Sequence, residues 1–272
     1  MISRNSSKRH LPQHWWYCLL LPAWTYAAFF LAQWLVVGCL HGLKALGVSF
    51  QAVNQTVYGA VVSVVVYVIS LVLVVGVPMW LFGRQTTARD LGVYSRPAWP
   101  DILLAPLAVV AYFICSSLVM MLAVRFLQVD TQVQQQLPFH PQMVTNQWDL
   151  VWIFVTLVVM APLAEELLFR GYLYGKLRKV TPIWLAIALT SLLFGAAHLW
   201  AGPGSSQLQW AVAIDTCVLS AFLCVTREYT GALWTSVLLH ASKNGLAFYL
   251  LYMSPDLVRQ LKQVSMILGG GI

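Results

Sequence analysis

Two adjacent glutamates followed by an arginine are the residues of this 272-residue chain that most suggest chemistry. Glu165 and Glu166 lie in an apolar run that continues to Arg170. Glu166 and Arg170 are four residues apart, so they share one face of a helix and are predicted to pair. Glu165 points about 100° away from them. It is the less neutralised carboxylate, which suits it to act as a general base. The alternative is an ion cluster that only joins helices.

Three polar residues further along the chain could complete a site with Glu165. If its helix and the next one form a hairpin that turns at Pro182, Glu165 and His198 stand at the same depth, each about 16 residues from the turn. His240 and Asn244 are four residues apart and share a helix face. An imidazole beside an amide can donate hydrogen bonds to an oxyanion. The alternatives are a zinc site made of Glu165, His198 and His240, or polar contacts between helices.

The segments that must position these residues are too apolar for a soluble protein. Of the chain, 60% is hydrophobic and 9% is charged, whereas soluble domains are about a quarter charged. Seven runs are long enough to span a bilayer, at about 16–40, 57–82, 101–125, 150–172, 182–200, 208–226 and 231–252. The sequence therefore predicts an all-α, polytopic transmembrane helical bundle of about seven spans. We expect a single domain over residues 1–272, with a motif-bearing core at about 150–252 and a C-terminal interfacial helix from Ser254.

Two further ionisable residues, Asp215 and Lys243, also lie in apolar runs. A charge inside a bilayer costs about 3 kcal/mol or more, which makes every such residue a functional candidate. Asp215 is predicted to be structural, because it can pair with Lys243 or face a cavity. Neither residue is therefore included among the candidate site residues.

The basic residues give the chain a formal net charge of +7. They lie in short clusters between the apolar runs rather than on one face, which is typical of membrane proteins and argues against nucleic-acid binding. These clusters occur before the first run and after the second, fourth and sixth runs. The N-terminus is therefore predicted to face the cytoplasm, and the lipid bilayer is the expected surrounding partner.

Three motifs follow one another through the predicted core. They are Glu165-Glu166-x-x-x-Arg170, Phe194-x-x-x-His198 and His240-x-x-x-Asn244. In order and spacing they resemble the motifs of the CAAX protease and bacteriocin-processing family, also called the ABI family, over about residues 161–245. The best-known members are endopeptidases that remove the last three residues of prenylated CAAX proteins. The resemblance implies an all-helical intramembrane endopeptidase of a bacterial cytoplasmic membrane, which acts on a protein or peptide substrate.

The resemblance also implies a role for each motif residue. Glu165 would activate a water molecule with the assistance of His198, while His240 and Asn244 would stabilise the tetrahedral oxyanion. The supporting residues would be Glu166 and Arg170, which orient the site, and Phe194. No cofactor is favoured, because the helical zinc signature H-E-x-x-H is absent from the sequence. Zinc held by Glu165, His198 and His240 is the metal-dependent alternative.

Two other functions fit part of this pattern. A non-catalytic binding or bacteriocin-immunity protein of the same fold would keep the motifs without cleaving any bond. A transporter or proton relay would also place glutamate and histidine side chains inside the membrane. Such a protein is expected to show inverted repeats, which the sequence lacks, and it would leave the His240-x-x-x-Asn244 pair unexplained.

Overall fold

The computed structural model describes residues 16–83, 85–131, 139–199 and 208–257. These residues form helices and no strands, which confirms the predicted all-α bundle. The first helices are α1 (Tyr17–Ala45), α2 (Gln55–Leu71), α3 (Val77–Phe82), α4 (Ala88–Leu91) and α5 (Trp99–Leu127). The later ones are α6 (Gln147–Phe154), α7 (Ala161–Glu166), α8 (Gly175–Val180), α9 (Ile183–Ala197), α10 (Trp210–Thr230) and α11 (Trp234–Phe248). The predicted interfacial helix falls mostly on residues 258–272, outside the described part.

Short stretches of wider or tighter helix connect several of these elements. The π-helical stretches are η1 (Val72–Gly76), η3 (Val155–Met160), η4 (Leu167–Tyr174) and η5 (Tyr249–Met253), and η2 (Pro141–Met143) is a 3₁₀ turn. With η3 and η4, the helices α6, α7 and α8 form one continuous helix. A π turn interrupts the regular hydrogen-bond pattern of an α-helix and often occurs at a functional site. The two glutamates of α7 lie between two such stretches.

Five continuous helices are long and apolar enough to cross a membrane. They are Tyr17–Ala45, Gln55–Phe82, Trp99–Leu127, Gln147–Val180 and Trp210–Thr230. Of the other two expected spans, α9 has 15 residues, which is shorter than the roughly 20 residues that a crossing needs. Helix α11 continues through η5 to Met253 but is not among the five helices that are both long and apolar enough. Large apolar side chains such as Leu107, which is 68% exposed, face outward, as is favourable in lipid. The chain is a multi-pass membrane protein.

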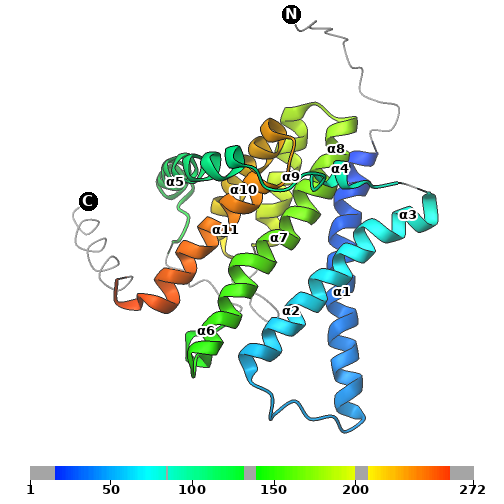
Figure 1. Cartoon of the computed structure of the whole chain (residues 1–272). Helices are drawn as coiled ribbons and strands as arrows, with labels where there is room; N and C mark the ends of the chain where they lie inside the picture. The colour runs from blue at the N-terminus through cyan, green and yellow to red at the C-terminus, as the bar shows by residue number, and fades with distance from the viewer. Residues whose placement is uncertain (1–15, 84, 132–138, 200–207, 258–272) are drawn as a thin grey trace, which may run out of the picture.

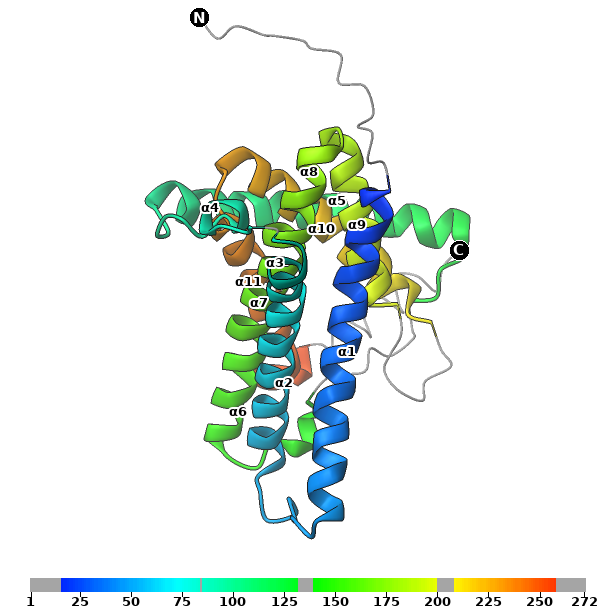
Figure 2. The ribbon, with the colours of Figure 1, turned by 90° about the vertical axis from the view of Figure 1, so that its right-hand side faces the viewer.

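The continuous helix from α6 to α8 is the element around which the site is built. Helix α2 contacts α6 and α7, and α11 contacts η3 and α7. Helices α9 and α10 both contact η4. In Figure 1 and Figure 2, the axes of α1, α2 and α6–α7 are roughly aligned, with α1 and α2 running in opposite directions, whereas α5 lies across them. The crosswise α5 packs against α10 and α11. Side chains from α2, α9 and α11 can therefore all reach the glutamates of α7.

Helices α9 and α10 approach each other closely at Gly195. A Cβ atom on Gly195 would lie 2.6 Å from the carbonyl oxygen of Ala213 and 2.9 Å from the Cβ of Cys217. No larger residue fits between these backbones, and small residues are what allow helices to pack this closely in membranes. His198 follows Gly195 by three residues. The close contact therefore fixes the end of α9 that carries the histidine.

An ion pair attaches the short helix α4 to the end of α8. The Nζ of Lys179 lies 2.5 Å from Oδ1 of Asp90. The hydrogen bond from Lys179 is the largest of the effects that hold the pKa of the Asp90 carboxyl below its usual range. This contact joins the segment before α5 to the continuous helix that carries the glutamates.

Candidate active site

Glu166 and Arg170 form the predicted ion pair at the centre of the site. Nη1 of Arg170 donates to Oε1 of Glu166 at 2.9 Å, and both side chains are completely buried. The Arg170 guanidinium carbon also lies 4.3 Å from the centre of the Phe194 ring, in a cation–π contact. A buried charge needs such compensation, because removing it from water is costly. The pair is therefore a fixed part of the interior.

The His240 ring has one nitrogen near each of the two glutamates. Its Nδ1 lies 2.9 Å from Oε1 of Glu166, and its Nε2 lies 3.8 Å from Oε2 of Glu165. Because a carboxylate only accepts hydrogen bonds, Nδ1 is the donor to Glu166. The second distance is too long for a hydrogen bond. Glu166 therefore orients the imidazole ring, and the ring presents Nε2 to the side where Glu165 lies.

Glu165 differs from its neighbour in exposure and in partners. Its side chain is 19% exposed, whereas that of Glu166 is not exposed at all. One carboxylate oxygen, Oε1, accepts a hydrogen bond of 2.7 Å from the hydroxyl of Tyr67 on α2. The other oxygen, Oε2, is the one that faces His240. The glutamate pair thus contains one buried, charge-paired member and one that a reactant can reach.

The sequence alone did not identify Tyr67 as a site residue. It lies in the run Val61–Ile69, where every other residue except Ser63 is valine or isoleucine. A hydroxyl in such a run needs a polar partner inside the membrane, which was the available signal. The sequence could not show that this partner is Glu165, because the two residues are 98 positions apart.

His198 stands at the end of α9, near the other ionisable groups. Its Nδ1 lies 2.8 Å from the carbonyl oxygen of Phe194, so Nδ1 is the donor and Nε2 is left free to accept in the neutral ring. Glu165, Lys243 and His240 lie within electrostatic range of its ring. Among the described residues no direct hydrogen bond joins His198 to Glu165. The structure therefore brings the two near each other without pairing them.

Phe194 is the apolar residue around which the site residues gather. Its ring centre lies 4.8 Å from that of His198 and 5.8 Å from that of His240, and the ring also receives the guanidinium of Arg170. The Phe194 side chain is almost fully buried, at 1% exposure. Phe194, which was expected to support the site, thus contacts both imidazoles and the Arg170 guanidinium.

Asn244 lies on α11 one turn beyond His240 and contacts the π-helical stretch η3. Its Nδ2 donates to the carbonyl oxygen of Leu157 at 2.9 Å. An amide nitrogen carries two hydrogens, so one donor is committed to this backbone contact and the second is not. Asn244 therefore joins α11 to the helix that carries the glutamates, and it retains one donor that a substrate could use.

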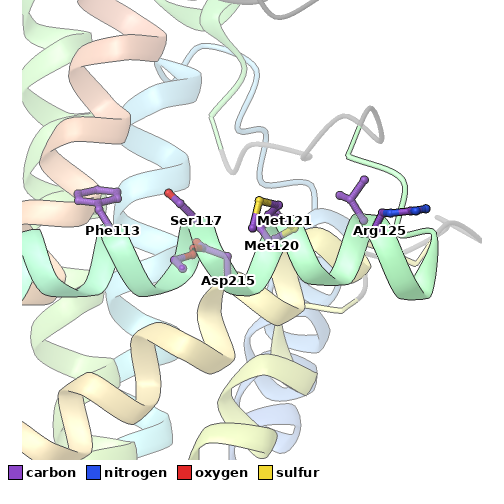
Figure 3. A pocket seen from close by; sticks show the side chains of 8 residues that line it. Phe113, Ser117, Met120, Met121, Arg125 and Asp215 are labelled. Atoms are coloured by element: carbon purple, nitrogen blue, oxygen red, sulfur yellow. The ribbon is translucent and has the colours of Figure 1, made fainter. Parts of the chain in front are cut away.

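A second polar cluster lies beside the site, at Asp215 on α10. Its Oδ1 accepts from the hydroxyls of Tyr112 at 2.6 Å and Ser116 at 2.5 Å, both on α5. Its Oδ2 lies 3.7 Å from Nζ of Lys243, so the predicted pairing is confirmed. Asp215 also lines a groove of about 680 Å³ between α5 and α10, shown in Figure 3, where Met121 and other residues of α5 line the groove. Both structural roles expected for Asp215 are therefore present.

The residues suggested as zinc ligands do not form a ligand set. In the described ranges, no group of three histidine, cysteine, aspartate or glutamate side chains is arranged to hold a metal ion. In the set Glu165, His198 and His240, both imidazoles direct Nδ1 to other protein groups, which leaves Nε2 as the nitrogen of each ring that could bind a ligand.

Comparison with known proteins places the site within one matched segment. Residues 147–246 match the family described as type II CAAX prenyl endopeptidase Rce1-like. An uncharacterized 24.3 kDa protein of Escherichia coli is 36% identical over 105 residues, which cover 37% of this chain and 45% of that protein. The chain thus spans less than half the length of this relative, and no solved structure matches it. Every motif residue lies inside the matched range, so the family match agrees with the resemblance to the CAAX protease and bacteriocin-processing family that the motifs indicated.

Proposed function

We propose that this chain is an intramembrane endopeptidase that hydrolyses peptide bonds of membrane-associated proteins or peptides. The observation that carries the proposal is the asymmetry of the glutamate pair. Glu165 is reachable and faces Nε2 of His240, while Glu166 is buried and holds the opposite side of the same ring. The match of this segment to a family of endopeptidases supports the same function. We place the protein in a bacterial cytoplasmic membrane with its N-terminus in the cytoplasm.

The proposed reaction uses a water molecule activated by Glu165. The carboxylate takes a proton from the water as the water oxygen attacks the carbonyl carbon of the substrate. The resulting oxyanion accepts a hydrogen bond from Nε2–H of His240. The Nδ1–H group of the same ring continues to donate to Glu166, so the ring carries both protons in this step. Asn244 donates its second amide hydrogen to the oxyanion. Glu165 then returns the proton to the departing amine. His198 assists by accepting a hydrogen bond from the water at Nε2.

The zinc-dependent alternative predicts a different response to chelators. We expect cleavage by the purified protein to continue after exhaustive treatment with EDTA and 1,10-phenanthroline, because the proposed base and donors are side chains. Elemental analysis of the same protein is expected to find zinc well below one ion per chain. Loss of cleavage that returns on adding zinc would instead support the metal-dependent version.

His198→Ala is expected to lower the cleavage rate by about 100-fold, the usual effect of losing a group that assists proton transfer. The yield of folded protein should change little, since the hydrogen bond of His198 runs to a carbonyl of its own helix. His41→Ala is the matched control, because His41 makes the same contact of 2.8 Å, to Val37, on an exposed part of α1. Equal activity of the two variants would remove His198 from the mechanism.

The substrate class can be identified by comparing cells with active and inactive protein. We would compare peptide termini in membrane fractions from cells that make the wild type or Glu165→Gln. The proposed function predicts new termini that depend on Glu165. A non-catalytic immunity or binding protein would leave the termini unchanged, and its biological effect would persist in the Glu165→Gln cells.

A further inference from the structure

The hydroxyl of Tyr67 is the one polar contact described for Glu165 that comes from outside the matched segment. Tyr67 lies on α2, before the matched residues 147–246. Its hydroxyl donates to Oε1 of Glu165 at 2.7 Å, across the contact between α2 and α7. The Tyr67 ring is itself held near Phe29 of α1, with ring centres 6.5 Å apart. The first helices of the chain therefore reach the candidate base directly.

This hydrogen bond assigns different tasks to the two oxygens of Glu165. Tyr67 occupies Oε1, which leaves Oε2 as the oxygen that faces Nε2 of His240 and can take a proton. Glu165 is 19% exposed, so packing alone does not fix its rotamer. A hydrogen bond from a hydroxyl to a carboxylate is short and charge-assisted, and it holds the plane of the carboxylate.

The bond also helps the carboxylate to exist as an anion inside an apolar bundle. An ionised group there is costly unless donors replace the water it has lost. Glu166 has Arg170 and His240 for this purpose, whereas the charged groups near Glu165 lie no closer than the 3.8 Å to His240. The Tyr67 hydroxyl is the direct donor in the described part of the chain.

We infer that Tyr67 is a positioning residue that orients Glu165 for proton transfer, and that α2 is therefore a functional part of the site. This inference rests on the proposed function. It means that the region before residue 147 contributes to catalysis as well as to membrane insertion. It also predicts that a fragment limited to the matched segment would lack one essential contact of its base.

Tyr67→Phe tests the inference because it removes the hydroxyl and keeps the ring. The matched control is Tyr174→Phe, because the Tyr174 hydroxyl also donates to a carboxylate, that of Glu228 at 2.8 Å, away from the site. The probe is a synthetic peptide that spans a Glu165-dependent cleavage site, presented in phospholipid vesicles with the full-length protein. We expect Tyr67→Phe to lower kcat by about 10- to 100-fold and to leave KM and the unfolding temperature close to wild type.

The outcomes separate this inference from the proposed function. An unchanged kcat in Tyr67→Phe, an equal fall in Tyr174→Phe, a change in KM alone or a loss of folded protein would each overturn the positioning role. If Glu165→Gln is inactive while Tyr67→Phe cleaves normally, only the inference about Tyr67 fails. If membrane fractions of wild-type cells show no peptide termini that depend on Glu165, the proposed function fails first, and the inference about Tyr67 fails with it.

Discussion

Glu165→Gln is expected to abolish peptide cleavage while the protein still folds and inserts into the membrane. Glutamine keeps the size of the side chain and can still accept the Tyr67 hydrogen bond through its amide oxygen. It cannot take a proton from water, so we expect the rate to fall by about a thousandfold or more. The rate would be measured on a Glu165-dependent peptide in vesicles, and folding by thermal unfolding of the purified protein.

Glu228→Gln is the matched control for this prediction. Glu228 lies near the end of α10 and pairs with Arg178 and Tyr174, outside the candidate site. The same chemical change there is expected to leave the cleavage rate within about twofold of wild type, as surface ion pairs contribute little. Substantial cleavage by Glu165→Gln, or equal losses in the two variants, would show that Glu165 is not the base.

Glu166→Gln is expected to damage both folding and activity. It leaves the fully buried guanidinium of Arg170 without its charged partner, and breaking a buried pair in this way costs about 3–5 kcal/mol. It also removes the charged acceptor that holds Nδ1 of His240. The expected result is a lower unfolding temperature, a lower yield of folded protein and little cleavage by the fraction that folds.

The double variant Glu166→Gln, Arg170→Met separates these two effects. Without the arginine no buried charge is left unpaired, so the unfolding temperature is expected to recover much of its loss. Cleavage is expected to stay low, because His240 still lacks its carboxylate. Two results would contradict this division: a single variant as stable as wild type, or a double variant with wild-type activity.

Local spacing made part of this site predictable from the sequence. The Glu166–Arg170 pair follows from the four-residue spacing of a helix, and the structure confirms it. The asymmetry of Glu165 and Glu166 follows from the rotation between adjacent helical residues. Such predictions succeed because they depend on one helix at a time. The Asp215–Lys243 pair needed two helices, and it was predictable only because few charged residues occur in the apolar runs.

Contacts between distant helices were not predictable in the same way. Tyr67 belongs to an aliphatic run without a motif, and only the packing of α2 against α7 brings it to Glu165. The crosswise orientation of α5 could not be predicted from the sequence either. An apolar run indicates the length and composition of a helix, but not its orientation relative to neighbouring helices. The Asn244 contact with Leu157 depends on the π-helical stretch η3, which the sequence did not indicate.

The measurement that tests the central claim most directly uses the purified full-length protein in vesicles, without other proteins. A peptide that spans a cleavage site found in cells would be incubated with wild type and with Glu165→Gln, and the products identified by mass spectrometry. We expect the wild type alone to form two fragments whose summed mass exceeds that of the peptide by one water molecule. No fragments from the wild type, or the same fragments from Glu165→Gln, would contradict it.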